Sequence, residues 1–173
     1  MESYKHVFAK RLLARWLADP QQDLFPSFHN ASGGGPFGGG VFFEYPICED
    51  GNGKWHGHDA PWNEICPEQF GDSCSDHDNG AWNCEWKTHP PSYDRCLELG
   101  LTPLVIFDVL AHHEGIPYIA VEVEHRNRIS KKKTARLESI LQHTSIELFV
   151  IDADWVLSQV RRPKKLKTLW TWR

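Results

Sequence analysis

The fold of this chain is decided by residues 102–124, TPLVIFDVLAHHEGIPYIAVEVE. Two apolar runs, at 102–111 and 116–124, are separated only by a short turn that contains Gly115. Runs of this kind are expected to form neighbouring antiparallel strands. The first run is apolar at nearly every position, which is typical of a strand buried on both faces. The stretch therefore predicts a β-hairpin at the centre of a sheet.

Further elements surround this hairpin. A helix is predicted at 4–18, where apolar residues recur every three or four positions until Pro20. Ser130 is expected to cap a helix that begins at Lys131, and Asp154 to cap a last short helix. The other predicted elements are a strand at 41–47, a helix at 92–99, a strand at 145–151 and a final strand that contains Trp170 and Trp172. The alternative for this basic tail is that its cations contact phosphates and its indoles stack on unpaired bases. This order predicts an α/β domain whose mixed sheet is flanked by helices.

The 173 residues fit a single domain, 1–173. Residues 48–91 interrupt it with an irregular insertion rich in Cys, His and Trp, which is too long for an ordinary connection. No apolar run of about 18 residues is present that would span a membrane. The first residues do not resemble a secretory signal. A cytoplasmic protein without a membrane partner is therefore expected.

The insertion carries candidate zinc ligands. Its irregular Cys and His spacing does not resemble a disulfide framework, so free thiols or metal ligands are expected, with Cys48 and Cys96 as core thiols. A structural Zn²⁺ needs four ligands in a tetrahedral arrangement. The candidates are Cys66, Cys74, Cys84 and one of His58 or His77. The alternative is a metal-free aromatic core made by Trp55, Trp62, Trp82 and Trp86.

Three carboxylates stand out in the hairpin. Asp108 interrupts the buried strand, where a charge is costly unless it is paired or bound to a metal. Glu122 and Glu124 share one face of the second strand by alternation, and Asp108 is expected to face Glu122 across the ladder. Such a cluster repels itself unless a cation compensates, and Mg²⁺ or Mn²⁺ is the natural partner. The alternative is that both glutamates face solvent and pair with Arg126 and Arg128.

The order Asp108, hairpin, Glu122-Val123-Glu124 resembles the core of the PD-(D/E)xK nucleases. The surrounding text, VIFDVLAHHEGIPYIAVEVEHRN, also resembles the nuclease part of competence CoiA-like proteins. The resemblance covers about residues 92–152. It implies that Asp108 and Glu122 bind the catalytic metal.

The match departs from the family at Glu124, which stands where a lysine is usual. Glu124 is accordingly expected to be a third ligand or to activate water, and Lys133 to supply the missing cation from the following helix. An extra acid often joins such sites from the first helix or strand, and Glu44 is the candidate here. The alternative for Glu44 is a surface residue near a strand end.

Charge is distributed unevenly along the chain, although the net charge is only −4. Residues 44–94 are acidic, whereas residues 126–136 and the tail from Arg161 onward are basic. Positive charge directly after the acidic site suits a scissile phosphate. The sequence predicts a metal-dependent endonuclease that hydrolyses phosphodiester bonds of nucleic acid. DNA is expected in preference to RNA as its partner. The alternatives are an inactive nucleic-acid-binding module of the same fold and a zinc-stabilised interaction protein.

Overall fold

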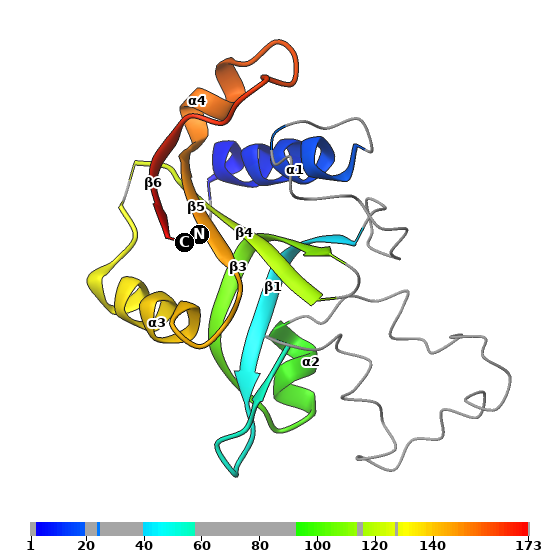
Figure 1. Ribbon diagram of the computed structural model, residues 1–173, viewed down its shortest axis with the longest axis vertical. Coiled ribbons are helices and arrows are strands. Elements are labelled where there is room, and N and C mark those ends of the chain that lie inside the picture. Colours follow the sequence, from blue (N-terminus) through cyan, green and yellow to red (C-terminus); the bar gives the residue numbers. More distant parts are fainter. Residues whose placement is uncertain are drawn as a thin grey trace, which may run out of the picture.

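The computed structural model describes residues 3–19, 24, 40–57, 93–113, 116–126 and 128–172 (Figure 1). Its strands are β1 (Val41–Glu49), β2 (Trp55–His56), β3 (Thr102–His113), β4 (Ile116–Glu124), β5 (Glu147–Asp152) and β6 (Thr168–Trp172). They form one six-stranded sheet in the order β2-β1-β3-β4-β5-β6. Only β4 and β5 are parallel neighbours, because a helix crosses over between them. The predicted mixed sheet is confirmed, including the final strand.

Within the described ranges, four helices accompany the sheet: α1 (Tyr4–Ala18), α2 (Tyr93–Glu98), α3 (Lys131–Leu141) and α4 (Ala153–Ser158). Figure 1 shows α1 and α3 on opposite sides of the sheet. The buried residues accordingly form two clusters. In one, α1 and α4 pack on Val109, Val121 and Ile151, and in the other α2 and α3 pack on Leu110 and Val150. The site described below lies where β3 and β4 separate between these clusters.

Side-chain caps begin three of the helices. Ser3 accepts a hydrogen bond from the His6 backbone N–H, and Ser130 accepts one from Lys133, as N-caps do. The cap expected for the last helix was wrong by two residues. Asp152, and not Asp154, is the cap, because β5 ends at Asp152 and its carboxylate accepts the Trp155 N–H at 2.7 Å.

The first part of the predicted insertion belongs to the sheet. Strand β1 continues to Glu49 and pairs with β2 through a hairpin, with Cys48 opposite His56. Residues 48–57 are therefore part of the core fold. Cys48 of β1 and Cys96 of α2, both fully buried, form a disulfide. This corrects the expectation that these two cysteines are free thiols.

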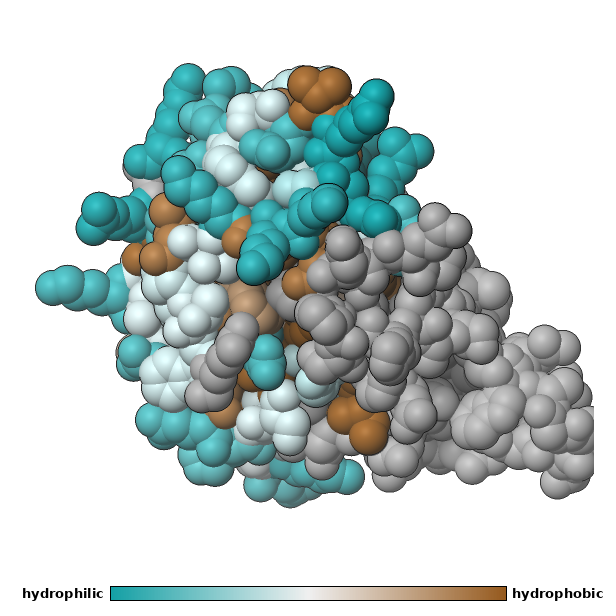
Figure 2. Space-filling model, turned by 45° about the horizontal axis from the view of Figure 1, so that its top comes forward, coloured by the Kyte–Doolittle hydropathy of each residue, from teal (hydrophilic) through white to brown (hydrophobic). Residues whose placement is uncertain are grey.

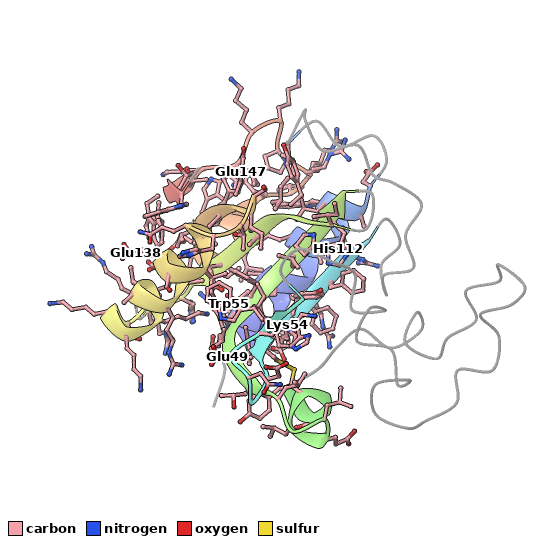
Figure 3. The ribbon with its side chains drawn as sticks, turned by 60° about the horizontal axis from the view of Figure 1, so that its bottom comes forward. Glu49, Lys54, Trp55, His112, Glu138 and Glu147 are labelled. Carbon is pink, nitrogen blue, oxygen red and sulfur yellow. A yellow bond between two sulfur atoms is a disulfide. The ribbon has the colours of Figure 1, made fainter. Side chains whose placement is uncertain are left out.

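His112 of β3 is a buried histidine that fills an aromatic corner (Figure 3). Its ring lies 4.9 Å from Phe42 and 5.2 Å from Tyr45, centroid to centroid. Within the described residues, no group hydrogen-bonds its Nε2 atom. Burial lowers the pKa of His112 from 6.5 to about 4, because the charged imidazolium loses its hydration. The ring is therefore neutral in the folded protein at neutral pH.

This depressed pKa predicts that His112 destabilises the fold in acid. Between pH 6.5 and pH 4 the unfolded chain binds a proton at His112 that the folded chain does not, so the contribution of His112 to the free energy of unfolding falls as the pH falls. The loss is about 3 kcal/mol over this window. Replacing His112 by Phe is expected to keep the ring contacts and remove that loss. Urea unfolding at several pH values measures it, with the exposed His143→Phe as control. An unchanged acid slope in His112→Phe would contradict the assignment.

Exposed apolar side chains are scattered over the described surface. On the face drawn in Figure 2 they form small separate groups between hydrophilic residues. Single exposed apolar residues are normal for folded proteins. Within the described part of the chain, no helix has the length and apolar character needed to cross a membrane.

Candidate active site

The site is built where β3 and β4 part. Their ladder ends at the pair Val109–Val121. Beyond it, β4 continues beside β5, whereas β3 continues beside β1. The Asp108 carboxylate spans the opening and accepts the Val123 backbone N–H at 2.8 Å, in place of a backbone carbonyl. Asp108 and Glu122 thus lie at facing positions one step beyond the last pair of the ladder.

Glu122 is the most deeply buried acid of the site, with 2 % of its surface exposed. Its Oε2 atom accepts a hydrogen bond from Lys133 Nζ at 2.5 Å. Its Oε1 atom is buried and has no hydrogen-bond partner among the described residues. Burial, and secondly the charge of Asp108, raise the pKa of Glu122 to about 8 against the opposing effects of Lys133 and of the Asp108 backbone N–H. The buried pocket therefore favours the neutral form of Glu122.

The negative charge of Asp108 has more basic groups near it than that of Glu122. His6 Nε2 lies 3.3 Å from its Oδ2, and Lys10 Nζ lies 3.8 Å from its Oδ1. Burial by itself raises the pKa of Asp108, but the His6 hydrogen bond, the charge of Lys133 and the Val123 N–H together lower it below its ordinary value. Asp108 is therefore ionised at neutral pH and adds to the field that keeps Glu122 protonated.

Two residues of α1 complete the environment of Asp108, and neither was predicted from the sequence. His6 Nε2 lies 2.7 Å from the Val123 carbonyl oxygen, and because a carbonyl can only accept, the imidazole N–H donates. Lys10 is buried, with 3 % of its surface exposed, and donates to Glu44 Oε1 at 2.6 Å. The available signal was their spacing, since residues four apart share one helix face.

Glu44 lies directly opposite Asp108. The register pairs Phe43 with Val109 and Tyr45 with Phe107, which leaves Glu44 facing Asp108 between them. Its φ of 54° falls in the left-handed region, which residues other than Gly seldom adopt. This backbone irregularity therefore determines which face of β1 carries Glu44. The Glu44 carboxylate is 55 % exposed, and within the described residues it is linked to the site through Lys10.

Asp108, Glu122 and Glu124 line one cavity of about 430 Å³, and basic residues line it with them. Its walls include Asp108 and Glu122 together with His6 and Lys133. The remaining charged or polar lining residues are Ser3, Glu124, His125, Arg126 and Arg128. The structure thus brings Asp108, Glu122, Glu124 and Lys133 together, as the sequence suggested, and leaves Glu44 at the edge.

Glu124 has a different local partner from the other acids. Its Oε1 atom accepts the Ile129 backbone N–H at 2.9 Å. This bond closes the turn that joins β4 to α3. The turn in turn sets where α3 begins, and so where Lys133 reaches Glu122. Glu124 therefore positions the turn while it lines the cavity.

Two metal sites were predicted from the sequence, one at the acids and one in the insertion. Among the described residues, no three His, Cys, Asp or Glu side chains already stand as a metal-binding group. At the cavity the available oxygen donors are the carboxylates of Asp108 and Glu122 and the carbonyl of Val123. The zinc candidates Cys66, Cys74, Cys84, His58 and His77 lie outside the described residues.

Comparisons of the chain with protein-family models, with curated proteins and with solved structures found no match. The site is therefore interpreted from its own geometry.

Proposed function

We propose that this chain is a metal-dependent nuclease that hydrolyses phosphodiester bonds of nucleic acid, with a PD-(D/E)xK-like core. One observation carries the proposal: Glu122 Oε1 is buried without a hydrogen-bond partner among the described residues, beside the ionised Asp108. A buried orphan oxygen is costly. Retaining it beside a second carboxylate makes physical sense where a cation binds to both.

The donor set fits a hard divalent cation. Asp108, Glu122 and the Val123 carbonyl offer only oxygens, which Mg²⁺ and Mn²⁺ prefer. The carbonyl accepts one hydrogen bond from His6 and keeps a second lone pair. A divalent cation held there supplies acidification of water and neutralisation of charge on a phosphate.

The chain's own residues prepare the site for an anionic substrate. The Nζ atom of Lys133 contacts the Glu122 carboxylate. In this proposal Lys133 replaces the lysine that usually follows the second acid in this core. Its side chain is 35 % exposed, so it also reaches a phosphate in the cavity. Arg126 and Arg128 line the same cavity and offer the positive charge that phosphate groups require.

Lys10 and His6 hold the other acid in place. Lys10 connects Asp108 with Glu44, and His6 connects Asp108 with the Val123 carbonyl. Both side chains approach from α1, whereas Lys133 belongs to α3. Preorganised groups of this kind avoid reorganisation at the moment of reaction.

The proposal is tested with purified protein and labelled single- and double-stranded DNA and RNA. Cleavage is expected with Mg²⁺ or Mn²⁺, and EDTA is expected to abolish it. The Glu122→Gln variant is expected to lose cleavage, and its matched control is Glu138→Gln, which removes one exposed carboxylate from the same helix as Lys133. Absence of cleavage on all four substrates with folded protein and either metal would refute the proposal.

A second function is a nucleic-acid-binding module without catalysis. It is favoured by the basic side chains already at Asp108, since His6 lies 3.3 Å and Lys10 lies 3.8 Å from this carboxylate. The two functions differ in one result. The binding module retains oligonucleotides in EDTA and leaves them intact after metal is added.

A further inference from the structure

A second, larger hollow continues from the acidic cavity along β3. It has a volume of about 680 Å³ and lies between α2 and α3. Its floor is the first half of β3, including Leu104 and Ile106, where no described strand pairs on the β4 side. The divergence of β3 and β4 that exposes the acids therefore also opens this groove. Lys133 lines both hollows.

The groove is positively charged. The charged residues that line it are Lys132, Lys133 and Arg136, and all three are cations from α3. Side chains that end in nitrogen project from this helix in Figure 3. Arg126 and Arg128 line the first cavity, together with the acids. Cations thus line both hollows, as a polyanion that passes from one to the other requires.

The floor and the opposite wall of the groove are apolar and aromatic. Leu104 and Ile106 are partly exposed, and Tyr93 and Leu97 of α2 are 49 % and 50 % exposed. Unpaired bases bind to apolar and aromatic surfaces through their faces while cations hold the phosphates. A duplex hides those faces by stacking and pairing. A neutral peptide would not use three cations.

We infer that this groove binds single-stranded nucleic acid, with bases on the β3 floor and Tyr93 and with phosphates along α3. The strand runs from the groove past Lys133 to the acidic centre. The inference rests on the proposed function for the direction of the strand, and it assigns that function a single-stranded substrate. DNA and RNA share the chemistry that the groove recognises.

The experiment measures binding without cleavage. Fluorescence anisotropy is recorded in EDTA with labelled single-stranded DNA, single-stranded RNA and duplex DNA of equal length. The Asp108→Asn protein serves as the background, because it carries one carboxylate fewer against the phosphates. On this background, Arg136→Ala and Tyr93→Ala test the two walls. Lys131→Ala is the matched control, a cation of the same helix that does not line the groove.

Single strands are expected to bind at least about tenfold more tightly than the duplex, and Tyr93→Ala to weaken them about tenfold. Arg136→Ala is expected to weaken binding and to reduce the slope of log K against log salt by about 0.7. Lys131→Ala is expected to leave that slope unchanged.

Equal or tighter duplex binding would overturn the inference, and so would identical behaviour of Arg136→Ala and Lys131→Ala. Because no metal is present, these outcomes are independent of catalysis. Groove-dependent binding by a wild-type protein that never cleaves would overturn the proposed function alone. Cleavage that is unchanged when Arg136→Ala and Tyr93→Ala are introduced into the protein with Asp108 intact would overturn the groove alone.

Discussion

Replacing Glu122 by Gln is expected to reduce metal-dependent cleavage by about 10³-fold while making the folded chain harder to unfold at pH 8. Activity falls because the amide is a poor ligand for a hard cation and leaves the metal with one carboxylate. Stability rises because the variant no longer has to keep a carboxylate in a buried pocket. Opposite signs for activity and stability are the mark of a residue kept for function.

The pH dependence gives this prediction its sign. The pKa of Glu122 is raised from 4.5 to about 8 in the folded protein. Between these values the folded chain holds a proton on Glu122 that the unfolded chain has lost, so the contribution of Glu122 to the free energy of unfolding falls as the pH rises. The loss amounts to several kcal/mol, with a ceiling of about 5. The slope ends above the folded pKa, where both states are ionised.

Thermal or urea unfolding from pH 5 to 8.5, combined with cleavage assays, checks both parts. Mg²⁺ is expected to restore the stability of the wild type at pH 8, since it binds the folded state, and to have no such effect on Glu122→Gln. Glu138→Gln, the exposed control, is expected to retain both the wild-type slope and the activity. Equal pH slopes in Glu122→Gln and wild type would show that Glu122 is not the protonated group.

The second large effect concerns the disulfide between Cys48 and Cys96. The two residues lie 48 positions apart, and closing a loop of this size is worth about 4 kcal/mol through the entropy of the unfolded chain. Replacing both by Ala is expected to lower the free energy of unfolding by about this amount. The bond joins β1 to α2, so its loss also loosens the wall of the groove that carries Tyr93.

Urea unfolding with and without reductant measures the contribution. Reductant is expected to shift the wild type to the midpoint of the double variant and to leave the double variant unchanged. The variant retains Cys66, Cys74 and Cys84, so it also reports on any other bond. A reductant effect of equal size in both proteins would place the stabilising bond elsewhere.

Local patterns carried most of the fold. The helix predicted at 4–18 and the strand predicted at 116–124 are confirmed at both ends, because periodicity and flanking Pro or Gly residues are short-range signals. Boundaries failed where long-range contacts decide. Strand β1 runs on to Glu49 because β2 pairs with it. No residue within β1 predicts that this pairing exists.

The candidate site divides along the same line. The sequence by itself determined that Asp108, Glu122 and Glu124 lie near one another, since a hairpin and strand alternation require nothing more than local geometry. It also pointed to Lys133, because Ser130 caps the helix and Lys133 follows within its first turn. Only the tertiary structure decided that His6 and Lys10 approach Asp108 from a helix about a hundred residues away in sequence. It also decided that Glu44 adopts a left-handed backbone opposite Asp108. Burial and the divergence of β3 from β4 leave Glu122 Oε1 without a hydrogen bond from the described residues. Such burial depends on the packing of distant segments, which no local pattern contains.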